Sequence, residues 1–180
     1  MKLDKFTIKS QEAIQAAQAV AMDKGHQSIT DLHLFEGIHE VDEQVLPFLF
    51  KKMGVSIDPI VQAVRAQLEG IPRVEGGQLY LSREANEIIQ KAQKHAQKNG
   101  DDFVSIEHLF SGIVATSGQV SRMLKDAGIS EKNLDKAIEE LRKGDKATTA
   151  SAENSYNALG KYALNLNELA DSGKLDPVIG

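Results

Sequence analysis

Two stretches of this sequence decide the fold, because the second nearly repeats the first. The stretch Thr30-Asp31-Leu32-His33-Leu34-Phe35-Glu36-Gly37-Ile38 returns 75 positions later as Ser105-Ile106-Glu107-His108-Leu109-Phe110-Ser111-Gly112-Ile113. Self-similarity at a fixed period indicates a duplicated structural unit. We therefore expect two repeats, over about residues 5–70 and 79–144, with a Pro- and Gly-containing linker over 71–78.

Each repeat predicts four helices, and neither has the alternating pattern of strands. Hydroxyl side chains mark the expected N-caps, at Thr7, Thr30, Ser82, Ser105 and Ser130. Glycines mark the expected helix ends, at Gly25, Gly54, Gly100, Gly128 and Gly144. A four-helix unit of this size buries little apolar surface alone, so the two should pack together. The predicted fold is all-α, an eight-helix bundle of two four-helix repeats related by a pseudo-twofold axis.

The composition changes after Gly144. Residues 145–155 are small and polar, which predicts a flexible tether. Apolar residues return from Tyr156 onward, and we interpret 156–180 as the start of a further module.

Charge and composition exclude several classes of function. The formal net charge of −5 is spread along the chain without a basic stripe, which argues against a nucleic-acid partner. The apolar runs are far shorter than the roughly 20 residues of a membrane span. The chain has no cysteine, which excludes thiolate chemistry and fits a cytoplasmic protein.

No catalytic or metal-binding motif stands out. There is no Gly-x-Ser-x-Gly elbow and no phosphate-binding Gly-x-x-x-x-Gly-Lys-Ser/Thr loop. The spacing of the five histidines fits no zinc site on a helix, and His33 and His108 are expected to pack at helix starts or lie at the surface. We therefore expect no catalytic activity, metal or cofactor within this chain.

A binding surface remains possible where the two repeats meet, because seams between helical repeats often form grooves. Thr7, Asp101 and Glu107 all fall at predicted helix entries or in the turn before them. From their pattern alone, each is interpreted as an N-cap or as a carboxylate facing a helix dipole.

Three segments carry a family resemblance: Leu3-Asp4-Lys5-Phe6-Thr7, Pro72-Arg73-Val74-Glu75-Gly76 and the ending Gly173-Lys174-Leu175-Asp176-Pro177-Val178-Ile179-Gly180. Together with the repeat, they resemble the start of the ClpB disaggregases of the Clp ATPase family. The resemblance implies a Clp N-type domain over 1–144 and a lead-in over 156–180 to a first AAA+ module that is absent here. Val178, Ile179 and Gly180 would begin its nucleotide pocket, so that ATP and Mg belong to the parent protein.

The resemblance also implies a function. Such domains engage aggregated or unfolded polypeptide and pass it to a homohexameric ATPase ring, in cooperation with the DnaK chaperone system during recovery from stress. Residues matching Thr7, Asp101 and Glu107 are tied to chaperone activity in relatives, which makes them candidates for a polypeptide groove as well as for capping. Lys91, His95 and His108 stand where some relatives carry exposed leucines, so this patch is more polar here.

A ClpC- or ClpA-like regulatory domain that docks one specific adaptor protein is the alternative. An adaptor should cover about 800 Å² of each partner, whereas a groove for unfolded chains should be narrower and promiscuous. On its own, the chain is expected to be a monomer, because the repeats satisfy each other internally.

Overall fold

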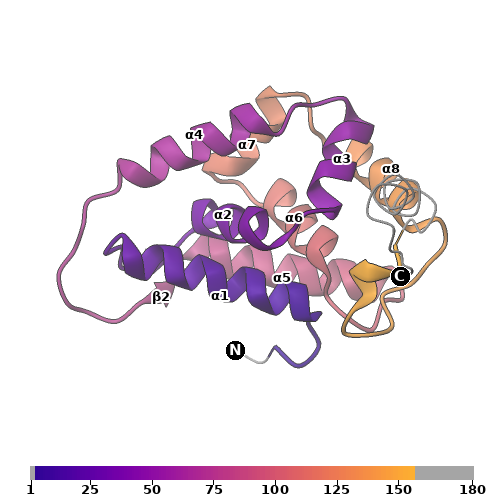
Figure 1. The fold of residues 1–180 in the computed structure, drawn as a ribbon, viewed down its shortest axis with the longest axis horizontal. Helices are drawn as coiled ribbons and strands as arrows, with labels where there is room; N and C mark the ends of the chain where they lie inside the picture. The colour runs from indigo at the N-terminus through magenta and orange to yellow at the C-terminus, as the bar shows by residue number, and fades with distance from the viewer. Residues whose placement is uncertain (1–2, 157–180) are drawn as a thin grey trace, which may run out of the picture.

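The computed structural model describes residues 3–156, and within them it has eight α-helices (Figure 1). The helices are α1 (Ile8–Asp23), α2 (Asp31–Val41), α3 (Val45–Met53), α4 (Asp58–Glu69), α5 (Arg83–Lys98), α6 (Ile106–Ala115), α7 (Gln119–Asp126) and α8 (Glu131–Arg142), followed by the short 3-10 helix η1 (Ala152–Asn154). The predicted all-α fold is confirmed.

The helices begin and end where the local chemistry predicts. The five expected hydroxyl residues all occupy N-cap positions, and the side chain of Thr7 accepts a hydrogen bond from the backbone N–H of Ser10. Gly54 ends α3 with a φ of 72°, in the left-handed region where only a residue without Cβ is unstrained. These signals are local, which is why the sequence alone locates them.

Two very short strands were not predicted. Strand β1 (Ser28–Ile29) pairs in parallel with β2 (Tyr80–Leu81), with Ile29 opposite Leu81. An isolated parallel bridge joins Phe6 to Val104. Under the 75-residue shift, Ile29 corresponds to Val104 and Phe6 to Leu81, so the two pairings are symmetry mates. Strands of two residues are too short to produce an alternating pattern.

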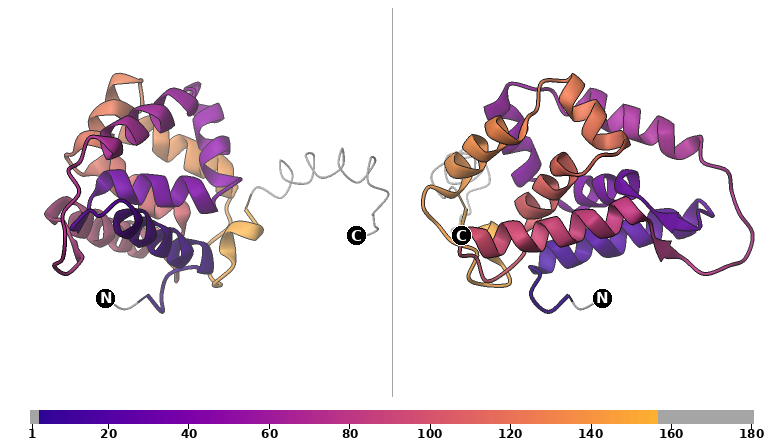
Figure 2. Two further views of the ribbon diagram at one scale, coloured as in Figure 1. Left: turned by 60° about the vertical axis from the view of Figure 1, so that its left-hand side comes forward. Right: turned by 180° about the vertical axis from the view of Figure 1, so that it is seen from behind.

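The two repeats are interlocked rather than side by side. Helix α3 of the first repeat packs on α6 and α8 of the second, and α7 of the second packs on α2 and α4 of the first. In Figures 1 and 2, α4 and α7 lie together on one side, while α1 and α5 form the opposite side with α2 and α6 between. The two central helices meet in the core through Phe35 and Phe110, whose ring centroids are 6.4 Å apart.

The repeated glycine of the signature lies at the closest helix contact in each half. A Cβ atom on Gly37 would come 2.8 Å from the backbone nitrogen of Ala17, and one on Gly112 would come 2.5 Å from the carbonyl oxygen of Ile88. Contacts this short do not occur, so only glycine lets α1 approach α2 and α5 approach α6 so closely.

Residues 145–156, which we call the strap, differ from the expected tether. The strap follows the surface of the domain, and its Ala147, Ala152 and Tyr156 are at most 2% exposed. Backbone hydrogen bonds join it to the first residue of α1 and to the segment before α6. Small polar residues fit a tether but equally fit a chain that packs closely on a helix end, and composition does not distinguish the two. The rest of the expected lead-in, from residue 157 onward, lies outside the described residues.

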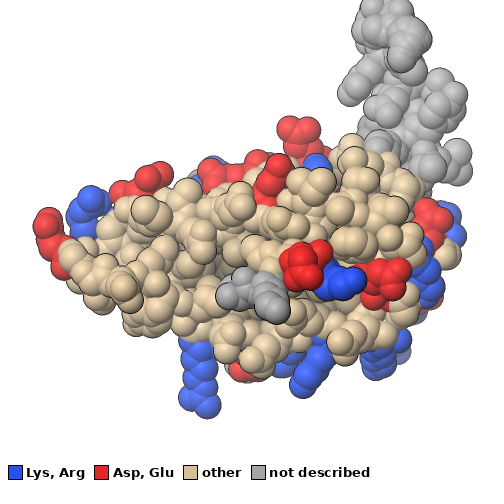
Figure 3. All heavy atoms as spheres, turned by 90° about the horizontal axis from the view of Figure 1, so that it is seen from below, with Lys and Arg blue, Asp and Glu red and all other residues tan. Residues whose placement is uncertain are grey.

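On the face seen in Figure 3, Lys and Arg are interspersed with Asp and Glu, and most of the middle is uncharged. None of the helices between residues 3 and 156 is both long and apolar enough to span a membrane.

Candidate functional site: a buried polar network beneath the strap

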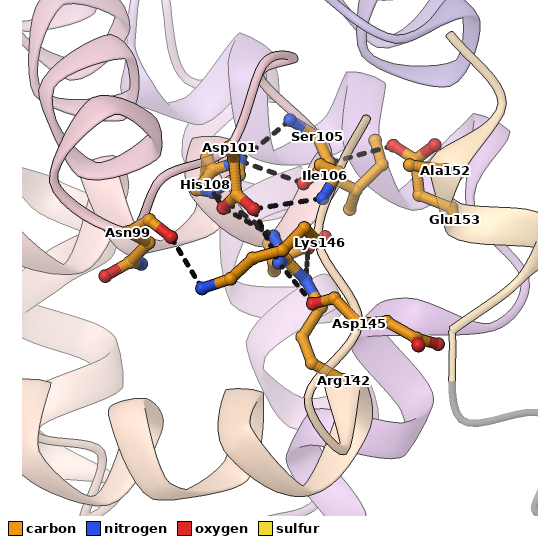
Figure 4. A network of polar contacts seen from close by, with 12 residues as sticks. Asn99, Asp101, Ser105, Ile106, His108, Arg142, Asp145, Lys146, Ala152 and Glu153 are labelled. Carbon is orange, nitrogen blue, oxygen red and sulfur yellow. Dashed lines mark hydrogen bonds and ion pairs between the residues drawn. The ribbon is translucent and has the colours of Figure 1, made fainter. Parts of the chain in front are cut away.

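The three candidate residues lie in one buried region, where the strap crosses the starts of α1 and α6. Figure 4 shows Asp101 there, with Arg142 and Glu153. Thr7 and Glu107 are 0% exposed and Asp101 is 8% exposed. Thr7 is the N-cap of α1, Glu107 lies in the first turn of α6, and Asp101 lies in the turn between α5 and α6. The capping interpretation is therefore confirmed for Thr7, and the helix-start position for Glu107.

Arg142, the last residue of α8, brings two of the candidates together. Its guanidinium donates to both carboxylate oxygens of Asp101 at 3.0 Å, and its Nε donates to Glu107 Oε2 at 2.6 Å. All three side chains are at least nine-tenths buried. The planar fork of arginine suits this arrangement, because it offers separate donors to each carboxylate. One guanidinium thus pairs with two buried carboxylates.

His108 completes the network from the third position of α6. Its Nδ1 accepts from the backbone N–H of Ser105 at 2.9 Å, which places the ring proton on Nε2, where it donates to Asp101 at 2.8 Å. Burial alone would raise the pKa of Asp101, but the hydrogen bonds from His108 and Arg142 lower it well below its usual range. Asp101 is therefore a fixed negative charge in the interior.

Thr7 joins the network through the strap. Its hydroxyl donates to Glu153 Oε2 at 2.6 Å, and the same oxygen accepts from the backbone N–H of Ile106 at 3.0 Å. Glu153 is 2% exposed, and burial raises the pKa of its carboxyl, partly offset by the Thr7 hydroxyl. Arg142 also lies over the ring of Tyr156, 4.6 Å from its centroid. The strap thus covers all three candidate residues.

The first repeat holds a different pair at the equivalent place. His33 Nδ1 accepts from the N–H of Thr30 at 2.9 Å, and its Nε2 lies 2.8 Å from Nδ1 of His26. Burial and the neighbouring His26 lower the pKa of His33 to about 4. His26 corresponds to Asp101 and Leu68 to Arg142, so this half has neither the carboxylate nor the guanidinium. The expectation that His33 and His108 pack at helix starts is confirmed.

Two grooves lie within the repeats. Where the repeats meet, side chains such as Ile14, Leu34 and Leu109 pack together. A pocket of about 360 Å³ lies where Gln119 of α7 approaches Ala66 of α4 and Pro72 of the linker. A groove of about 880 Å³ runs between α5, α6 and α8, with Leu134 and Ile138 among its lining residues. Its counterpart between α1, α2 and α4 is smaller, about 390 Å³.

The polar patch expected in place of leucines is split by the structure. Lys91 and His95 line the larger groove, and Lys91 forms an ion pair with Glu87. His108 is fully buried below it and belongs to the network instead.

Sequence reasoning missed Arg142 and Glu153. Arg142 interrupts the repeat, since its counterpart is Leu68, and a charged residue at an apolar repeat position is a signal that could have found it. Glu153 lies in a small, polar stretch with no counterpart in the first repeat, and no pattern singles it out.

Within residues 3–156, no group of three or more His, Asp or Glu side chains is placed to hold a metal ion. Val178, Ile179 and Gly180, expected to begin a nucleotide pocket, lie outside the described part of the chain.

Comparison with known proteins shows which family the chain belongs to. Residues 5–127 match the Clp repeat (R) N-terminal domain. The chain is 48% identical over its whole length to the chaperone protein ClpB of Bacteroides thetaiotaomicron and 46% identical to that of Porphyromonas gingivalis, and it spans 21% of each of these relatives. Its fold is similar to the N-terminal domain of Hsp104 from Candida albicans, with a TM-score of 0.74 and 21% identity, covering 83% of this chain and 99% of that one. The match extends over well more than half of the sequence, and the chain therefore belongs to the Clp repeat N-terminal domain family.

Proposed function

We propose that this chain is the substrate-recruiting N-terminal domain of an ATP-dependent protein disaggregase. It would bind unfolded or aggregated polypeptide and pass it to the hexameric ring of its parent protein, in the cytoplasm and together with the DnaK system. The observation that carries this proposal is the 48% identity to a ClpB chaperone along the whole chain. ATP, Mg and their hydrolysis would belong to the parent's further modules.

The groove between α5, α6 and α8 is the binding place we propose for polypeptide. It is the larger of the two grooves, and its lining combines the apolar Leu134 and Ile138 with lysines on α5 and acids on α8. Such a mixed lining favours weak contact with many sequences over tight contact with one. Weak binding suits a domain present in several tethered copies, because multivalency raises the overall affinity while each contact stays easy to release.

Thr7, Asp101 and Glu107 have a positioning role in this proposal. Their side chains are buried and bonded within the network, so polypeptide in the groove would not reach them while the strap is in place. Arg142 connects the two regions, because it lines the groove and also binds Asp101. Direct contact of the three candidates with substrate stays a prediction.

An NMR titration with an unfolded, apolar-rich polypeptide tests the proposal. We expect amide shifts along α5, α6 and α8, and the same shifts with a second, unrelated unfolded chain. Ala115→Trp should fill the groove and weaken binding at least fivefold, whereas Glu40→Trp, at the equivalent place in the smaller groove, should leave binding unchanged.

Two outcomes would contradict the proposal. Shifts produced by one folded partner protein but by no unfolded chain would favour the adaptor-docking alternative. Equal loss of binding in both tryptophan variants would place the site elsewhere.

A further inference from the structure

We propose that the strap is a releasable clasp, which docks reversibly on the starts of α1 and α6 and so sets how much free chain leads away from the domain. The clasp does not depend on the proposed function, because it concerns how this chain binds itself. Its docking site is the region that holds Thr7, Asp101 and Ile106.

The backbone contacts of the strap are few and lie at three residues: Asp145, whose carbonyl accepts from the Arg142 guanidinium at 3.1 Å, Ala147 and Ala150. The carbonyl of Ala147 accepts from the N–H groups of Asp102 and Phe103 at 2.9 and 3.0 Å, and the N–H of Ala147 donates to Asp101 Oδ1 at 2.9 Å. The carbonyl of Ala150 accepts from the N–H of Ile8 at 2.8 Å. None of these bonds is part of a helix ladder, so water can replace each of them when the strap leaves.

The strap contributes little apolar surface to the domain. Its buried apolar side chains are those of Ala147, Ala152 and Tyr156, whereas the helices bury many large aliphatic and aromatic residues. Because apolar burial is the main stabilising term in a protein core, the eight helices do not require the strap. A segment with few apolar contacts can open locally without global unfolding.

Glu153 makes the docking both specific and marginal. Its Oε2 receives the Thr7 hydroxyl and the Ile106 N–H at the positive end of the α6 dipole. Its Oε1 is buried without a hydrogen bond, and the carboxylate of Glu107 acts on it with the same charge. Burying a carboxylate that is only partly paired is costly, so Glu153 holds the strap less firmly than a fully hydrogen-bonded carboxylate would.

Release of the strap would increase the distance that the chain can span beyond the end of α8. As a free coil, residues 145–156 would add a root-mean-square span of about 20 Å between the domain and whatever follows. Thr7 and Asp101 would then influence function as positioning residues that control this length. Residues that are buried under the strap could in this way affect function without contacting a partner.

Amide hydrogen exchange of the whole chain tests the clasp. The amides of Ile8, Asp102 and Phe103 bond to the strap without touching Glu153, so they report on docking of the whole segment. In the native chain we expect them to be protected, but at least tenfold less than the α2 amides of the core. Glu153→Ala should lower their protection a further tenfold or more and leave α2 unchanged. Asp145→Ala removes an exposed acid from the same strap and should change neither.

The proposal would be overturned by either of two results. If the three amides exchange at open-chain rates in the native protein, the strap does not dock. If they exchange only together with the α2 amides, before and after Glu153→Ala, the strap is an integral part of the fold and is not released.

Discussion

The two repeats place a histidine at the third position of the same helix and give it different partners. His108 donates to Asp101, which Arg142 also holds, whereas His33 lies against a second histidine, His26. The two contacts have the same length, 2.8 Å. The same position in the fold therefore accepts two kinds of partner for its histidine. In the second repeat the partner is a charged carboxylate that an arginine also binds, and in the first repeat it is a second histidine. The difference lies in whether a guanidinium reaches the site.

Removing that guanidinium should have the largest effect. Arg142→Met leaves the buried carboxylates of Asp101 and Glu107 without a counter-charge. We expect a loss of about 3–5 kcal/mol in the free energy of unfolding, measured by urea denaturation. The control is Arg65→Met in the first repeat, where the side chain pairs with Glu36 but is 48% exposed. It should cost less, about 1–2 kcal/mol, because only one carboxylate loses its partner and water reaches the half-exposed pair. Equal costs would mean that the second network does not carry the difference between the halves.

Acid should affect the first repeat before the second. His33 has a pKa of about 4 when folded, below its ordinary value near 6.5, so the unfolded chain binds more protons between these values. Stability is then fully present above about pH 6.5 and falls as the pH drops toward 4, by about 3 kcal/mol. Asp101, whose pKa is lowered, loses its contribution only below the ordinary aspartate range.

Matched substitutions can assign that pH dependence. His33→Gln keeps a side chain able to complete the capping box with Thr30 but removes the titrating ring. It should flatten urea-unfolding stability between pH 6.5 and 4. His108→Gln leaves the His26–His33 pair in place and should keep the slope. A slope that survives His33→Gln would show that the protons bind elsewhere.

The smallest loss of stability should come from substituting the glycine that both repeats share. Gly37→Ala and Gly112→Ala each place a methyl group against the backbone of the neighbouring helix. Each should destabilise by about 1–3 kcal/mol through overpacking, and by similar amounts. Thermal unfolding of the two variants checks this. If one substitution leaves the thermal stability unchanged, the two helices in that repeat are packed less closely than the equivalent pair in the other repeat.

Local signals explain why the helices could be predicted and the site only in part. A hydroxyl residue such as Thr7 or a glycine such as Gly54 fixes a helix end by contacts within a few residues. The network instead joins Glu107 to Arg142 and Thr7 to Glu153, pairs separated by 35 and 146 positions. Such contacts depend on the packed fold. The resemblance named three residues that the structure brings together, but nothing in the pattern indicated that the strap covers them.

The interlocked packing also bears on how this domain could have arisen. A single repeat would leave the faces of α3 and α7 that cross between the halves uncovered, and two copies related by a twofold axis would cover them for each other. The chain has the geometry of a homodimer with exchanged helices, made into one polypeptide through residues 71–78. In a true homodimer, every substitution appears twice. Covalent joining removes that constraint, so that one copy can hold Asp101 and Arg142 while the other holds a histidine and a leucine in their places.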